Sequence, residues 1–244
     1  RISQAEDGAG DRAGEMACQS AKIAKAAAAA AGREVWVAGS IGPTGKSLTL
    51  AQNISDRAYR PYSFDQMADA FEEQIRGLAE GGVDVILLET CFDALNTKAA
   101  IYALERTGFD IPVMISASSS DRSGRTLTGQ TIEAFYRSVQ HARPISFGLN
   151  CSLGAEELAP LIEDVASWAE CAVSCHPNAG LPDELGTYTE TPEQTARAIC
   201  KMAGRGLLNI AGGCCGTTPA HIKAIAEALR GIAPRPLPAE SSSL

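Results

Sequence analysis

Short apolar runs alternate with longer amphipathic stretches along most of this 244-residue chain. The runs are rich in β-branched residues and have the length of strands, whereas the stretches between them repeat apolar residues at helical spacing. We predict strands over 34–42, 84–90, 112–119, 145–151, 171–178 and 207–215, and helices that begin near Arg12, Ser63, Asn96, Thr131, Gly154, Thr191 and Pro219. The helix from Ser63 should end at a glycine pair, and Thr218 should cap the helix that opens with Pro219.

Strands that are apolar along their length and separated by helices indicate a parallel sheet covered on both faces. This class includes the doubly wound open sheet and the (β/α)8 barrel. Polar and reactive residues stand at the carboxyl ends of successive strands, and a barrel gathers all such ends around one mouth. These residues are Glu89, Ser118, Asn150, Cys151, Asn178, Cys214 and Cys215. We therefore predict an α/β fold, a (β/α)8 TIM-type barrel. With six predicted strands, this chain is expected to lack the first two βα units.

The two ends of the chain differ in composition from its middle. Residues 1–11 are small and polar, and "APRPLPAESSSL" at the C-terminus has the Pro- and Ser-rich composition of a linker. We expect a barrel domain over 1–234, incomplete at its N-terminus, and a linker over 235–244 toward further modules.

Composition and charge argue against several classes of protein. The net charge is −8 and the Lys and Arg residues do not cluster, which disfavours nucleic acid or an anionic membrane as partner. No apolar run approaches the roughly 20 residues of a membrane helix, and no secretory signal opens the chain. The eight cysteines lack the spacing of a disulfide framework, so we expect reduced thiols in a cytoplasmic protein.

The stretch "NIAGGCCGTTP" holds the main candidate chemistry. A disulfide between neighbouring cysteines is strained, but Cys214 and Cys215 can both turn toward one soft metal ion. Cys151 ends another strand, so three thiolates could converge and leave a fourth position open, as in catalytic zinc sites. The alternative is ordinary buried cysteines at tight turns. The thiols lie over sixty residues apart and no CxxC pair exists, so spacing alone leaves both interpretations open.

Three other strand-end residues carry weaker signals. Glu89 ends an apolar strand, where a substrate ammonium, a backbone N–H or an arginine would have to compensate its burial. His176 could be a ligand or a base, but a lone histidine before proline is more often structural. Asn178 could lend its amide oxygen to a metal or to a substrate. Cys175 is the nearest extra thiol, whereas three other thiols are interpreted as core or helix residues: Cys18, Cys171 and Cys200.

The glycine-rich segment "GSIGPTGKS" over 39–47 is similar to a phosphate-binding P-loop, but it fails the spacing. A P-loop needs a glycine where this chain has Ser40, so we interpret the segment as a plain βα loop.

Several longer motifs carry a family resemblance. "FGLNCSLG", "HPNAGLP" and "LNIAGGCCGTTPAHI" resemble the homocysteine-binding, zinc-containing domain of cobalamin-dependent methionine synthase. The wider group is the homocysteine S-methyltransferases, which include betaine-dependent enzymes. The likeness runs from about Gly39 to Pro234, and "ILLETCFDALNTKAA" and "ISASSSDRSGRTLTGQTIEAFY" follow in family order. The family's first strand, with its glycine-rich loop, has no match here, and neither has the second.

The resemblance implies a barrel in which Cys151, Cys214 and Cys215 hold zinc and homocysteine becomes a zinc-bound thiolate that attacks a methyl group. It implies that Glu89 holds the substrate ammonium and that Asn178 is a fourth zinc ligand, displaced by homocysteine. We also place Asn150 and Ser118 among the substrate-binding residues.

The predicted function is that of a methyltransferase: the homocysteine-activating domain of methionine synthase. Methylcobalamin and methyltetrahydrofolate would be carried by other modules of the same enzyme or by a separate chain. One rival is a homocysteine methyltransferase that uses betaine or S-methylmethionine. A rival of another class is a non-catalytic zinc- or thiol-binding fragment.

Overall fold

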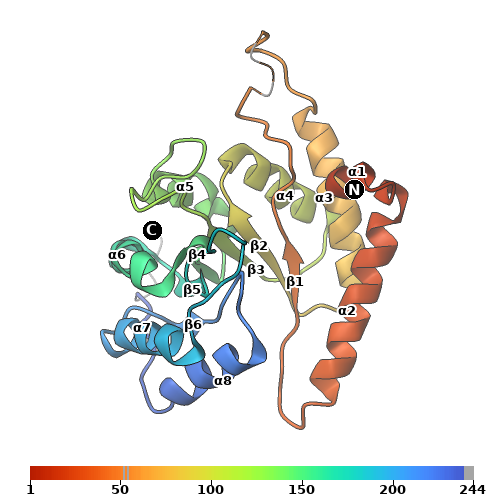
Figure 1. Cartoon of the computed structure of the whole chain (residues 1–244). Helices are drawn as coiled ribbons and strands as arrows, with labels where there is room; N and C mark the ends of the chain where they lie inside the picture. Colours follow the sequence, from red (N-terminus) through yellow and green to blue (C-terminus); the bar gives the residue numbers. More distant parts are fainter. Residues whose placement is uncertain (52, 54, 239–244) are drawn as a thin grey trace, which may run out of the picture. The chain divides into compact units, whose positions relative to one another are not determined.

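The computed structural model describes residues 1–51, 53 and 55–238, and in it strands and helices alternate along the chain (Figure 1). Six strands form one sheet, and their order in the sheet, β1 to β6, is their order in the sequence. The resolved strand pairs are parallel. The predicted α/β fold with six parallel strands is confirmed.

The chain divides into two compact units, of which the first comprises Arg1–Met114 and Ser138–Arg143. Strands β1 and β2 pair in parallel, with Ala38 opposite Val85. Helix α3 packs against α2, α4 and β1. The elements of this unit are α1 (Ile2–Glu6), η1 (Gly10–Arg12), α2 (Ala13–Ala29), β1 (Ala38–Ile41), α3 (Phe64–Glu80), β2 (Val85–Cys91), α4 (Ala94–Thr107) and η2 (Gln140–Ala142).

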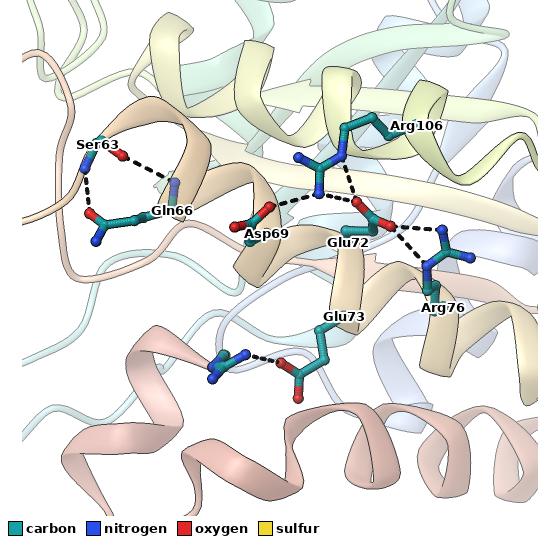
Figure 2. Close-up of polar contacts among 8 residues, drawn as sticks. Ser63, Gln66, Asp69, Glu72, Glu73, Arg76 and Arg106 are labelled. Carbon is teal, nitrogen blue, oxygen red and sulfur yellow. Dashed lines mark hydrogen bonds and ion pairs between the residues drawn. The ribbon is translucent and has the colours of Figure 1, made fainter.

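Helix α3 shows why the local sequence sets these boundaries. Ser63 and Gln66 form a reciprocal capping box that satisfies two backbone N–H groups at the start of the helix (Figure 2). On the same helix, Glu72 accepts hydrogen bonds from Arg76 and from Arg106 of α4 (Figure 2). The Glu72 side chain is 16% exposed, so a partly buried ion-pair network links α3 to α4.

The second unit comprises Ile115–Arg137 and the chain from Pro144 onward. Strand β4 pairs in parallel with β5, and β5 with β6. Its core holds the fully buried rings of Phe135 and Phe147, and the ring centroid of Tyr136 lies 4.9 Å from that of Phe147. Its elements are β4 (Ser146–Gly154), α6 (Ala155–Trp168), β5 (Ala172–Asn178), α7 (Pro192–Gly204), β6 (Ile210–Ala211) and α8 (Pro219–Ala228); β3 (Val113–Ala117) and α5 (Ile132–Val139) have residues in both units.

The predicted helix starts agree with the structure to within two residues, but β1 and β6 are less than half as long as predicted. Strand β1 begins at Ala38 rather than at residue 34. Strand β6 covers only Ile210–Ala211 instead of 207–215, because the chain then turns at the glycine pair. A Cβ at Gly212 would lie 2.6 Å from the His176 ring, so the backbone there packs too closely for a larger residue.

Arg235 is the first residue of the predicted C-terminal linker. Arg235 is 9% exposed and donates hydrogen bonds to carbonyl oxygens around the end of α6, so it belongs to the packed second unit. Residues 239–244 of the linker predicted over 235–244 lie outside the described part of the chain, so the linker stays a prediction.

All eight cysteines are free thiols, as predicted. Among the described residues, no helix combines the length and the hydropathy that a membrane span requires.

Candidate metal centre

Cys151 lies on β4, at a point where the strand leaves its regular geometry. From Ser146 to Asn150 the strand pairs residue by residue with β5, and the register then shifts before Gly154. Cys151 and Ser152 have φ angles of 64° and 62°, in the left-handed region. Each such residue costs on the order of 1–2 kcal/mol when it is not glycine. The backbone therefore stores strain at the residue that carries the thiol.

Cys214 and Cys215 lie on the turn that follows β6. The Cys214 N–H donates to the Pro177 carbonyl oxygen at 2.7 Å, and the Cys215 carbonyl oxygen accepts from the Ala179 N–H at 2.9 Å. Both residues of the pair are thus fastened to the end of β5. This fastening fixes the direction of two consecutive side chains.

Gly216 completes the turn, and only glycine fits there. Its φ angle is +76°, and a Cβ would lie 2.3 Å from the Cβ of Tyr188. Tyr188 stands on the segment after β5, which forms a short antiparallel bridge between Pro182 and Tyr188.

The three thiols form one cluster. The sulfur of Cys151 lies 3.7 Å from that of Cys215, which lies 3.9 Å from that of Cys214. All three sulfurs lie within 4.8 Å of one another, and no other group of three His, Cys, Asp or Glu side chains in the described residues is arranged to hold a metal. The structure therefore brings together the three cysteines that the sequence singled out.

The spacing and chemistry of the cluster fit zinc. With Zn–S bonds of about 2.3 Å, tetrahedral coordination places sulfurs about 3.8 Å apart, close to the two separations here. Burial raises the pKa of Cys214 to about 12 and also raises that of Cys151. Without a metal these thiols keep their protons at neutral pH, and a bound cation would convert them to thiolates. Three cysteines leave one position of a tetrahedron open for another ligand.

The sequence model of the family described as homocysteine S-methyltransferase matches residues 1–229. The chain belongs to the homocysteine S-methyltransferase family. The family match begins at residue 1, well before Gly39, where the motif resemblance begins.

Solved structures of one homocysteine methyltransferase have the same fold. The apo form of MmuM from Escherichia coli matches with a TM-score of 0.70 at 18% identity, covering 90% of this chain and 75% of that one. Its metallated form matches with a TM-score of 0.70 at 20% identity, covering 93% of this chain and 75% of that one. At this identity the likeness concerns the fold.

In this homocysteine S-methyltransferase chain, two of the predicted asparagines adjoin the cluster. The Asn178 Oδ1 atom accepts a hydrogen bond from the Cys215 N–H at 3.2 Å. The Asn150 Nδ2 atom donates to the Cys214 sulfur at 3.7 Å. Both side chains are buried, with exposed fractions of 3% and 1%.

Ser118, predicted to bind substrate, lies just beyond the end of β3. Its hydroxyl is 2.8 Å from the hydroxyl of Ser152, the residue next to Cys151. The side chain is 5% exposed. Ser118 is thus hydrogen-bonded to the strained segment that carries the first thiol.

Glu89 belongs to the first unit, at the end of β2. It accepts a hydrogen bond from the hydroxyl of Ser40 on β1 and forms no ion pair within the described residues. The next residue, Thr90, has a φ angle of 55°, which is rare for a β-branched side chain. As at Cys151, backbone strain accompanies a residue with predicted chemistry.

The remaining candidates lie outside the sulfur cluster. Cys175 is fully buried, and burial raises its pKa to about 12, as expected of a core thiol. His176 packs against Gly212 and is not part of a metal-holding group in the described residues. In the glycine-rich loop, Lys46 forms an ion pair with Glu6.

Sequence reasoning missed three residues that surround the sulfurs. Ser116 donates to the Asn150 side chain, the backbone N–H of Ser152 adjoins the Cys151 sulfur, and the Tyr188 side chain adjoins Cys215. Ser116 could have been found, because it stands two positions before Ser118 and therefore on the same face of β3. Tyr188 gave no such signal, because loop geometry brings it to the cluster.

Proposed function

We propose that this chain binds homocysteine and one zinc ion and transfers a methyl group to the homocysteine sulfur, giving methionine. The observation that carries the proposal is the group of three cysteine sulfurs within 4.8 Å of one another in a member of this family. A metallated form of MmuM, which has a similar fold, has been solved, and this supports the proposal that the present chain also binds a metal.

Each residue of the cluster has a proposed task. Cys151, Cys214 and Cys215 hold the zinc ion. Asn178 supplies the fourth ligand until substrate arrives, since its Oδ1 atom is held beside Cys215 and has a second lone pair to offer. Ser118 and Asn150 line the place where homocysteine binds, and Glu89 holds its ammonium group.

When bound, zinc supplies a Lewis acid that lets the homocysteine thiol lose its proton near neutral pH. In the transfer, a sulfur–methyl bond forms while the bond between the methyl group and its donor breaks, and the thiol proton leaves to solvent. The three cysteines would hold the metal and leave a fourth ligand position for substrate.

The finer context rests on the motifs. We propose that the methyl donor is methylcobalamin on another module of a methionine synthase, and that residues 1–234 form part of a (β/α)8 barrel. The strand order supports the barrel, because a doubly wound sheet reverses its order at a switch point, whereas β1 to β6 run in sequence order. Betaine or S-methylmethionine is the rival donor.

Metal analysis tests the site. The purified chain should contain near-stoichiometric zinc, and Cys214→Ala should lose most of it. Cys200→Ala is the matched control, since Cys200 is half-buried on α7, outside the cluster, and should keep its zinc. Equal zinc in the Cys214→Ala variant and the wild type would refute the assignment.

A donor assay tests the reaction. Homocysteine and the zinc-loaded chain are incubated separately with methylcobalamin, betaine and S-methylmethionine, and methionine is measured. Methionine from methylcobalamin supports the methionine synthase context, and methionine from a small donor supports the rival. Zinc binding without methionine from any donor would favour the non-catalytic fragment.

A further inference from the structure

Two buried side chains connect β3 to the sulfur of Cys214. The Ser116 hydroxyl donates to Oδ1 of Asn150 at 2.8 Å, and Nδ2 of Asn150 lies 3.7 Å from the Cys214 sulfur. Ser116 and Asn150 are each 1% exposed. Water is therefore a poor substitute for either partner.

The chemistry of a metal-bound sulfur determines which way the Asn150 amide faces. A thiolate carries no proton and can only accept, so the amide must present its nitrogen to Cys214. The amide oxygen then faces Ser116, whose hydroxyl can donate. The hydrogen bond from Ser116 complements the amide orientation that serves a thiolate.

We propose that Ser116 and Asn150 are positioning residues for the metal centre, and that the Asn150 amide draws charge away from the Cys214 sulfur and fixes its direction. This inference rests on the proposed zinc function. A zinc ion bound by three cysteine thiolates forms a centre with a net charge of −1, and a homocysteine thiolate would add another negative charge. A donor aimed at one sulfur stabilises this excess charge and makes that sulfur less nucleophilic than the substrate sulfur. The methyl group is then directed to homocysteine rather than to the protein.

The other two sulfurs have donors of a different kind. The Cys151 sulfur is contacted by the backbone N–H of Ser152, and Cys215 by the half-buried Tyr188. Of these three donors to the sulfurs, Asn150 is the one that is a buried side chain, and it is held in turn by Ser116. It can therefore be removed by substitution without changing the backbone of the site.

The test compares Asn150→Leu, Ser116→Ala and Ser146→Ala in the full chain. Ser146 is the matched control: it is fully buried on β4, the strand of Asn150, and its hydroxyl has no hydrogen-bond partner among the described residues. Zinc affinity is measured by competition with a chelator, and the cobalt-substituted protein gives the energy of the sulfur-to-metal charge-transfer band.

Loss of a contact to a metal ligand typically weakens metal binding about 10- to 100-fold, and we expect Asn150→Leu to fall in this range. Its charge-transfer band should move to longer wavelength, because the sulfur holds its electrons less tightly. Ser116→Ala should shift both readouts in the same direction by less, and it carries the test if Asn150→Leu does not fold. Ser146→Ala should change neither.

An unmoved band and wild-type zinc affinity in both Asn150→Leu and Ser116→Ala would overturn the inference and leave the proposed function intact. Weaker zinc binding with an unmoved band would also overturn it, because that result assigns the pair a purely structural role. If the wild-type chain itself takes up neither zinc nor cobalt, the proposed function fails and the inference fails with it.

Discussion

Arg235 offers a sharp test of how the C-terminal segment supports the second unit. Its guanidinium donates to the carbonyl oxygens of Ala166, Ala169 and Cys171 at distances from 2.8 to 3.2 Å. These carbonyls lie in the last turn of α6 and in the connection to β5, where a helix has no backbone donors of its own to offer. The Asn209 side chain in turn donates to the Arg235 carbonyl at 2.8 Å.

The expected effect of Arg235→Ala follows from these contacts. A hydrogen bond from a charged donor contributes about 1.5–3 kcal/mol, but the contacts share one side chain, whose ordering costs about 2 kcal/mol. We expect the free energy of unfolding to fall by about 2–4 kcal/mol, since the exposed fraction of 9% leaves little room for water to replace the guanidinium. For a chain of this size that corresponds to a melting temperature lower by roughly 5–12 °C.

Thermal and urea unfolding of Arg235→Ala measure the loss, with Arg230→Ala as control because Arg230 is exposed on the surface near the same end. Arg235→Lys should recover only part of the stability, since an ammonium cannot reproduce the planar fork. If Arg235→Ala unfolds within about 0.5 kcal/mol of the control, a range typical of surface substitutions, the guanidinium does not stabilise the end of α6 and this reasoning is wrong.

The remaining predictions concern the site. Glu89→Gln should weaken homocysteine binding by about 1.5–3 kcal/mol in calorimetry, because a charge-assisted hydrogen bond is lost, while zinc content stays constant; unchanged affinity would contradict its role. Gly216→Ala should lower zinc affinity through its clash with Tyr188, whereas Gly231→Ala, with a φ of +79° and open space around its Cβ, should not; equal effects would mean that backbone strain alone matters. Zinc affinity should fall as pH decreases, by up to about tenfold per unit for each proton displaced, because the raised pKa of Cys214 keeps that thiol protonated. A zinc titration that does not depend on pH between 6 and 8 would contradict this assignment.

Much of the fold could be predicted because its signals are local. Helix α3 begins at Ser63 because that residue and Gln66 satisfy the first N–H groups, and this capping motif is visible in the sequence. The length of β6 was not predictable in the same way. Residues 207–215 are apolar enough for a strand, but close packing of Gly212 on His176 decides that the chain turns. Arg235 was assigned to a linker because its neighbours are prolines, and its burial depends on carbonyls more than sixty residues away.

The candidate site likewise contains residues that the sequence identifies and residues whose role depends on tertiary contacts. The three cysteines could be identified because residue type and strand-end position are properties of the sequence. Ser116 shares a strand face with Ser118, which is visible in the sequence, but its contact with Asn150 on the neighbouring strand is not. The left-handed backbone at Cys151 has no sequence signal either, because no glycine or asparagine occupies the position.

The arrangement of the ligands along the chain links metal uptake to folding. Cys214 and Cys215 are consecutive, whereas Cys151 is separated from Cys215 by 64 positions. In the unfolded chain the adjacent pair can still contact a metal, but recruiting the third thiol requires closure of a long loop, which costs about 4 kcal/mol in entropy. Full coordination is therefore available only after β4, β5 and β6 have assembled. A metal ion would bind fully only to the folded state and would therefore stabilise it. A substitution that destabilises α6 or α7 should then weaken metal retention without changing a ligand.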